Sequence, residues 1–158
     1  MARCLIIGCG CRGRELVGTL KARGHVVRAT TRRRDRVGEI EAGGAEAVVA
    51  DPDRIATVAP AFDHVSVACV LLGAATGPPE QLRALHGPRL DMLLTRMLDT
   101  TVRGLVYEVP DGELGRTGAG IVRAACEASL IPYVLLDTDR GDHAGWLQAA
   151  AAAFERVL

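Results

Sequence analysis

Aromatic side chains, lysine and excess charge are all scarce in this chain of 158 residues. Aromatic residues make up 3% of it, and Lys21 is the one lysine among 19 basic residues. Because 19 acidic side chains balance the basic ones, no overall field favours binding to nucleic acid. The hydrophobic content of 49% must come largely from Val, Leu, Ile and Ala, which are typical of the core of a parallel sheet.

Long apolar runs and a regular cysteine pattern are also missing. The first apolar segment is short and ends at Gly8, so we expect no signal or membrane segment and a cytoplasmic protein. The odd number of cysteines lacks the spacing of a disulfide framework: Cys4, Cys9, Cys11, Cys69 and Cys126. Cys9 and Cys11 would supply only half of a zinc site, so no metal is expected. Both are interpreted as small residues of a tight turn, although thiols near a helix N-terminus can be reactive.

The most informative segment is the glycine-rich turn Gly8-Cys9-Gly10-Cys11-Arg12-Gly13, between an apolar run and a helical segment. We expect Gly8 to permit a tight turn after the first strand and Gly10 to let a pyrophosphate approach the backbone. Gly13 is expected to let the helix pack closely on the sheet. The free N–H groups at the start of the helix would then bind the phosphates. This order of elements predicts a dinucleotide site.

The end of the second predicted strand indicates which dinucleotide is bound. NAD sites usually place a carboxylate there, but the first carboxylate of this segment is Asp35. Arg32 and Arg33 would instead pair with the 2′-phosphate of NADP, and Thr31 could add a hydroxyl. We therefore predict NADP(H), with NAD(H) as the lesser alternative. A solvated basic loop without a ligand is the other interpretation.

Strand and helix patterns alternate along the whole chain. Strands are predicted at residues 4–7, 25–30, 45–50, 65–72, 104–109 and 132–136. Helices are predicted at residues 12–23, 34–42, 53–59, 90–100, 118–129 and 142–157, with a loop at 73–79. Such alternation implies a parallel sheet covered by helices on both faces. We expect one α/β domain over residues 1–158, a doubly wound Rossmann fold with six strands in the order 3-2-1-4-5-6.

With these elements placed, the chain resembles the short-chain dehydrogenase/reductase superfamily, and in particular its atypical and extended, NmrA-like and epimerase-like members. Four segments carry the resemblance: Leu5–Leu16 with the glycine motif, Arg23–Arg32, the strand ending at Asp51, and Val102–Tyr107. The resemblance implies a Rossmann fold that holds NADP through Gly8, Gly10, Gly13, Arg32 and Asp51. In this family the acid at the place of Asp51 bonds the adenine amino group. Asp51 before Pro52 is also a common turn signal, and both interpretations stay open.

The chain departs from the superfamily where catalysis would occur. Active members use a Tyr and a Lys four residues apart, whereas Lys21 lies on the first predicted helix and both Tyr107 and Tyr133 lie inside predicted strands. After the fifth strand, the segment 108–111 (Glu-Val-Pro-Asp) stands where relatives have hydroxyl residues. Ordinary alcohol dehydrogenation through a Tyr/Lys proton relay is therefore not predicted.

The remaining candidates for chemistry follow the ends of the later strands, where sites of this fold lie. Glu108 and His86 are weak catalytic candidates. The alternatives are an exposed strand end for Glu108 and a surface loop for His86. Further candidates follow the fifth and sixth strands: Asp111, Glu113, Asp137, Asp139, Asp142 and His143. Those after the sixth strand, Asp137, Asp139, Asp142 and His143, could hold a general acid/base or a weak cation. Asp142 is also a natural helix N-cap. Trp146 and Phe154 share one helix face, which indicates core or a subunit interface.

Three functions fit these observations. The first is a small NADP(H)-dependent oxidoreductase or isomerase that acts on an activated substrate without the Tyr/Lys pair. The second is a non-catalytic NADP(H) redox sensor that acts through a protein partner, as the resemblance to NmrA-like proteins implies. The third is a structural subunit with a relic motif. The apolar surplus also suggests a homo-oligomer. The sequence names neither the substrate nor the protein partner.

Overall fold

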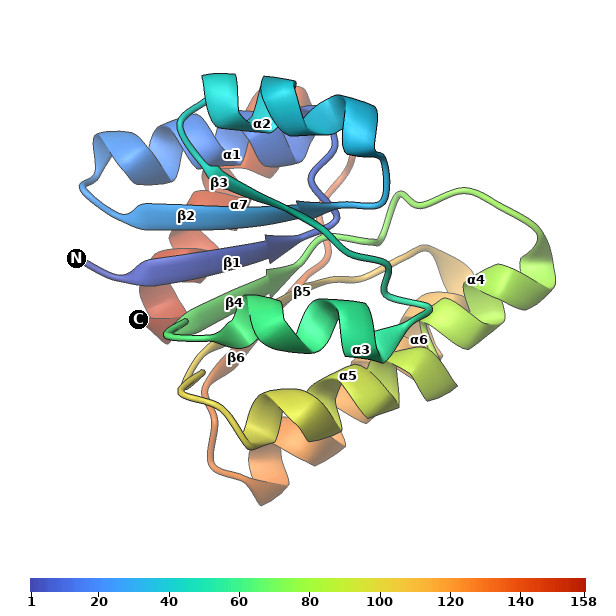
Figure 1. Ribbon diagram of the computed structural model, residues 1–158. Helices are drawn as coiled ribbons and strands as arrows, with labels where there is room; N and C mark the ends of the chain where they lie inside the picture. The colour runs from blue at the N-terminus through green and yellow to red at the C-terminus, as the bar shows by residue number, and fades with distance from the viewer.

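Six parallel strands form one sheet in the computed structural model, which describes residues 1–158. The strand order is β3-β2-β1-β4-β5-β6, so the predicted fold class and strand order are confirmed. The strands are β1 (Arg3–Ile7), β2 (Val26–Thr31), β3 (Glu46–Val49), β4 (Val67–Val70), β5 (Leu105–Glu108) and β6 (Tyr133–Leu136). All carboxyl ends meet at the right-hand edge of the sheet in Figure 1, and both termini lie at the opposite edge.

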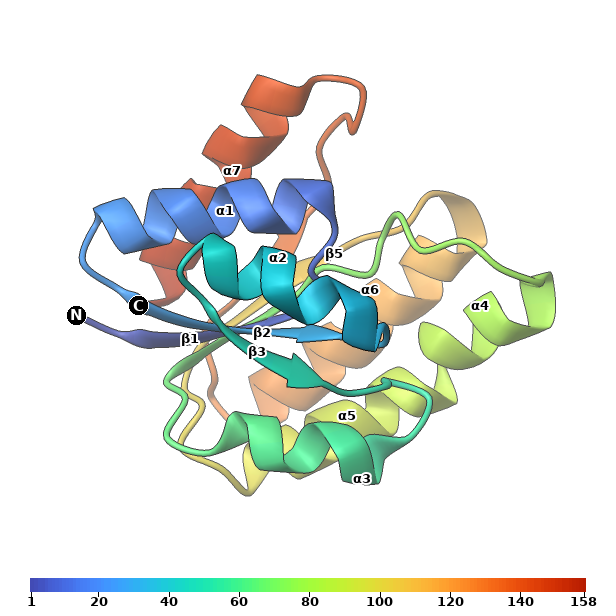
Figure 2. The same ribbon diagram turned by 45° about the horizontal axis from the view of Figure 1, so that its top comes forward.

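Helices cover both faces of the sheet (Figure 2). One face carries α1 (Cys11–Ala22), α2 (Val37–Ala42) and α7 (His143–Val157). The other carries α3 (Ile55–Val58), α5 (Pro88–Leu98) and α6 (Gly112–Ala128), with α4 (Pro79–Leu85) beyond the carboxyl ends of the strands. Short 3-10 helices precede α2 and follow α3: η1 (Arg34–Arg36) and η2 (Ala59–Phe62). No helix has the length and apolar character that a membrane span requires.

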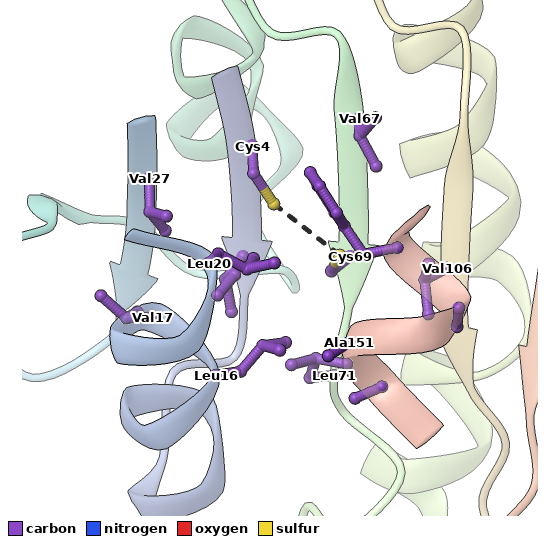
Figure 3. Packing of buried hydrophobic residues seen from close by; sticks show 14 of the residues in the cluster. Cys4, Leu16, Val17, Leu20, Val27, Val67, Cys69, Leu71, Val106 and Ala151 are labelled. Atoms are coloured by element: carbon purple, nitrogen blue, oxygen red, sulfur yellow. Dashed lines mark hydrogen bonds between the residues drawn. The ribbon is translucent and has the colours of Figure 1, made fainter. Parts of the chain in front are cut away.

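Alternate residues of the central strands enter two separate cores, because successive side chains of a strand point to opposite faces. In β1, Cys4 and Ile6 join a cluster of 21 buried residues, and Leu5 and Ile7 join one of 18 on the other face. Figure 3 shows the first cluster, in which the sulfur atoms of Cys4 and Cys69 lie 3.8 Å apart. Trp146 and Phe154 belong to the same cluster, which confirms the core interpretation of that helix face.

The structure corrects the predicted helices at one missed helix and one boundary. Helix α4 occupies a segment for which no helix was predicted, and α6 begins at Gly112 instead of residue 118. Glycines discourage helix in the first half of α6, but its backbone packs closely here: a Cβ on Gly115 would meet the Pro110 carbonyl, and one on Gly118 would meet the Tyr107 hydroxyl. Close packing against the end of β5 therefore outweighs helix propensity.

Two glycines of α6 allow a matched test of this packing. We expect Gly118→Ala to lower the free energy of unfolding by about 2 kcal/mol, because the methyl group would overpack against Tyr107. Gly120 is exposed, and a Cβ there has no neighbour within 4 Å. Gly120→Ala should therefore raise the free energy of unfolding by about 0.5–1 kcal/mol through helix propensity alone. Urea denaturation measures both, and equal effects would contradict the packing explanation.

Candidate functional site

A cleft of about 610 Å³ opens at the carboxyl ends of the strands. Most of the predicted cofactor residues line it: Gly8, Cys9, Gly10, Cys11, Arg12, Gly13, Thr31, Arg32 and Arg33. Glu108 also lines it, whereas Asp51 and His86 do not. The fold thus brings the glycine-rich turn, the basic segment after β2 and the end of β5 to one cavity.

The glycine-rich turn has the geometry that an anion site needs. Gly8 has a φ of +90°, and a Cβ there would lie 2.8 Å from the Leu71 carbonyl oxygen. Gly10 has no atom within 4 Å of where its Cβ would be, so the space beside its backbone is open. No side chain caps α1, which leaves the first N–H groups of the helix free to bind a phosphate.

The third glycine differs from the expectation. Gly13 is buried, but its Cβ would lie 3.5 Å from the Cys9 sulfur and 3.6 Å from the Gly8 carbonyl oxygen, which are ordinary contacts. Close packing therefore does not require glycine here. Burial raises the pKa of the neighbouring Cys9 to about 11, so this thiol stays protonated near neutral pH and is a poor nucleophile.

The arginines after β2 differ in how far they are engaged. Arg33 forms a 2.7 Å ion pair with Asp35, and Arg36 lies 3.4 Å from Glu39. Arg32 lines the cleft and forms no ion pair, so its guanidinium is available to a ligand. Thr31 accepts a hydrogen bond from the Arg33 backbone N–H through its hydroxyl oxygen, at 3.1 Å.

Asp51 makes a turn. Its Oδ1 atom accepts a hydrogen bond of 2.9 Å from the Asp53 backbone N–H, and the next two residues, Pro52 and Asp53, line the cleft. The structure shows the turn interpretation of Asp51 directly. We did not anticipate Pro52 and Asp53 as cleft residues, although their place after β3 pointed there.

Glu108 is buried, with 3% of its side chain exposed, and the expectation of an exposed strand end is wrong. Its Oε1 accepts a hydrogen bond from the Gly73 N–H at 2.8 Å, and its Oε2 accepts one from Trp146 Nε1 at 2.9 Å. Two guanidinium groups, of Arg12 and Arg140, lie 3.6 and 3.7 Å from Oε2. The carboxylate therefore links the ends of β4, β5 and β6 with α1 and α7.

His86 is also buried, with 2% exposed, so the surface-loop interpretation is wrong. Its Nδ1 lies 2.7 Å from the hydroxyl oxygen of Tyr107, which is fully buried. Burial lowers the pKa of His86 and raises that of Tyr107, so both groups are neutral at physiological pH. The pair braces α4 and α5 against β5 and does not reach the cleft.

No tyrosine and lysine meet at this site. Lys21 donates to the Gly44 carbonyl at 2.9 Å, and Tyr133 donates to Glu127 at 2.8 Å, both outside the cleft. The later acidic residues form no metal cluster either. Asp142 caps α7 by accepting from the Gly145 N–H at 3.0 Å, which confirms the N-cap interpretation. His143 lines the cleft and lies 3.2 Å from Glu15.

The sequence did not reveal Arg140 and Trp146 as partners of Glu108. Both come after the carboxyl end of β6, where sites of this fold occur, and that was the available signal. Their contact with Glu108 joins positions 32 and 38 residues apart in the chain, and no local pattern indicates such a pairing.

Comparisons with known proteins agree with this geometry. A family model described as NAD(P)H-binding matches residues 8–129, and no curated protein matches the chain. A short-chain dehydrogenase/reductase superfamily protein from Agrobacterium tumefaciens, solved with bound NAD, is 20% identical with a TM-score of 0.69; the match covers 84% of this chain and 48% of that one. Triphenylmethane reductase from Citrobacter sp., complexed with NADP(H), is 18% identical with a TM-score of 0.67, and the match covers 85% of this chain and 49% of the reductase. Vestitone reductase from alfalfa is 14% identical with a TM-score of 0.68, and the match covers 85% of this chain and 56% of the reductase.

These structural similarities concern the fold. The chain spans about half the length of the solved structures it resembles. The matched family model covers both the glycine-rich turn and the end of β5, which both line the cleft.

Proposed function

The chain belongs to the NAD(P)H-binding family, and from this premise we propose that it binds NADP(H) in the cleft at the carboxyl ends of its strands. The diphosphate would lie against the open backbone at Gly10 and the uncapped N-terminus of α1. The observation that carries the choice of NADP(H) is the unpaired guanidinium of Arg32 after β2, where NAD-binding relatives of this fold place a carboxylate.

The preference can be tested at Arg32. We expect Arg32→Ala to weaken NADPH binding at least about tenfold and NADH binding by less than about twofold, because a charge-assisted hydrogen bond to the 2′-phosphate is worth about 1.5–3 kcal/mol. Arg34→Ala is the matched control, since Arg34 is exposed, forms no ion pair and does not line the cleft. Calorimetric titration measures both affinities. Equal binding of NADPH and NADH by the unaltered protein would contradict the preference.

Whether the bound cofactor can serve in catalysis depends on whether a side chain of the cleft can donate or accept a proton. Glu108 is the one carboxylate at the inner end of the cleft, and it already accepts two hydrogen bonds and faces two arginines. It is therefore a poor general acid or base. His86 and Tyr107 bond each other away from the cleft. We infer that neither Glu108 nor the His86–Tyr107 pair relays protons to the bound cofactor.

Two roles remain within this proposal. One is hydride transfer to an activated substrate such as an imine or a conjugated enone, and the other is sensing of the NADP redox state for a protein partner. Because the carboxylate of Glu108 already accepts two hydrogen bonds and faces two arginines, it is a poor proton donor to a substrate, which favours the sensing role. Oxidation of NADPH in the presence of carbonyl, imine and enone compounds would support the reductase. Tight NADPH binding with no oxidation across these compounds would support the sensor.

A further inference from the structure

Arg12 has hydrogen-bonding capacity that the protein does not use. Its side chain lines the cleft with 17% exposed, yet its guanidinium makes no hydrogen bond to any protein atom. The Nη1 atom is buried without a partner. The nearest carboxylate oxygen, Oε2 of Glu108, lies 3.6 Å from Nη2 and already accepts from Trp146. Buried donors without acceptors are costly, so such a group points to a ligand that supplies oxygen atoms.

The guanidinium is nevertheless held in a fixed place. It lies over the Trp146 ring, with 4.8 Å between its central carbon and the ring centroid. Glu108 holds the same ring through the indole N–H, so the carboxylate and the tryptophan together position Arg12. A pre-positioned planar donor suits a carboxylate, which it can bind with two parallel hydrogen bonds.

The local charge also favours an anion. Arg12 and Arg140 share the single buried carboxylate of Glu108, since both lie within 3.7 Å of its Oε2. The only other acidic partner is Asp111, which is 93% exposed and lies 3.2 Å from Arg140. The buried group therefore carries one excess positive charge, and a bound anion at Arg12 would balance it.

We propose that Arg12 binds the carboxylate of a second ligand beside the nicotinamide end of the cofactor. The Arg12 backbone belongs to the turn that would bind the diphosphate, but its side chain reaches Glu108 at the end of β5. In sheet order β5 is two strands from β1, about 10 Å, so this end of the side chain lies away from the diphosphate. The ligand class is a monocarboxylate, the substrate if the protein is a reductase and an effector if it is a sensor. This role rests on the proposed function, but anion binding by Arg12 does not.

The unaltered protein provides a direct test, because Trp146 is its only tryptophan and touches Arg12. Trp146 fluorescence is followed while acetate, pyruvate or benzoate is added at constant ionic strength, with and without saturating NADP⁺. The matched amides serve as neutral controls. We expect a saturable change with at least one carboxylate, at least about tenfold weaker with its amide, that persists in the presence of NADP⁺.

Two variants assign the response to Arg12. Arg12→Gln should abolish the carboxylate response, whereas Arg14→Gln should retain it, because Arg14 lies on the same helix outside the cleft and pairs with Glu39 at 2.8 Å. Circular dichroism establishes that each variant is folded. If Arg12→Gln does not fold, Arg12→Lys keeps the charge but loses the planar donor pair, and a weakened response supports the proposal.

The outcomes separate the two proposals. A response that NADP⁺ abolishes by competition would assign Arg12 to the cofactor phosphates and overturn the second-ligand site. The absence of a response to every carboxylate would overturn it as well. A carboxylate response in a protein that binds no NADP(H) would sustain the anion site and overturn the proposed function.

Discussion

Glu108→Gln is expected to lower the free energy of unfolding by about 3 kcal/mol, because breaking a buried ion pair leaves its partners without compensation. A glutamine offers one oxygen, which can accept from Gly73 or from Trp146 but not from both. Its amide group would face the other N–H donor. Arg12 and Arg140 would also lose the buried carboxylate that they share.

Urea denaturation and thermal melting measure this effect, and the melting temperature should fall by about 10 °C. Asp111→Asn is the matched control, since it removes the charge of the exposed acid that faces Arg140 and should cost less than about 1 kcal/mol. If Glu108→Gln proved as stable as Asp111→Asn, the buried carboxylate would not organise this end of the cleft.

The same substitution at two glycines of the turn should change stability to very different extents. Gly8→Ala is expected to destabilise the fold by about 3 kcal/mol, because alanine is strained at a φ of +90° and its Cβ would meet Leu71 and Leu72. Gly10→Ala should change stability by less than about 1 kcal/mol, since its backbone is extended and its Cβ would project into open space.

Although Gly10→Ala should hardly change stability, it should weaken cofactor binding. The added methyl group would occupy the space proposed for the diphosphate, so we expect NADPH affinity to fall at least about tenfold in a fully folded protein. Thermal melting reports stability and calorimetric titration reports affinity for the same preparation. A Gly10→Ala protein that binds NADPH as well as the unaltered chain would remove the turn from the proposed site.

The sequence predicted the sheet because its signals are local. After Arg3, the residues of β1 are apolar on both faces, as are those of β4, which gives the continuous runs typical of a parallel strand, and glycines or turn residues mark the ends of these runs. The glycine-rich turn could be placed for the same reason, since strand, turn and helix follow one another directly in the chain.

The inner end of the cleft could not be predicted in this way. Glu108 contacts Trp146 across 38 positions of sequence, and His86 contacts Tyr107 across 21, so their burial depends on tertiary contacts. The start of α6 was missed because helix propensity disfavours Gly112, Gly115 and Gly118, whereas the close approach to the end of β5 favours glycine at positions 115 and 118. In each case packing between distant segments outweighed the local signal.

A crystal structure of the protein with NADPH tests the central claim most directly. We predict the diphosphate on the free N–H groups at the start of α1, the 2′-phosphate beside Arg32, and the nicotinamide toward Glu108. A cleft that stays empty in crystals saturated with NADPH, or a cofactor bound on another surface, would contradict the account.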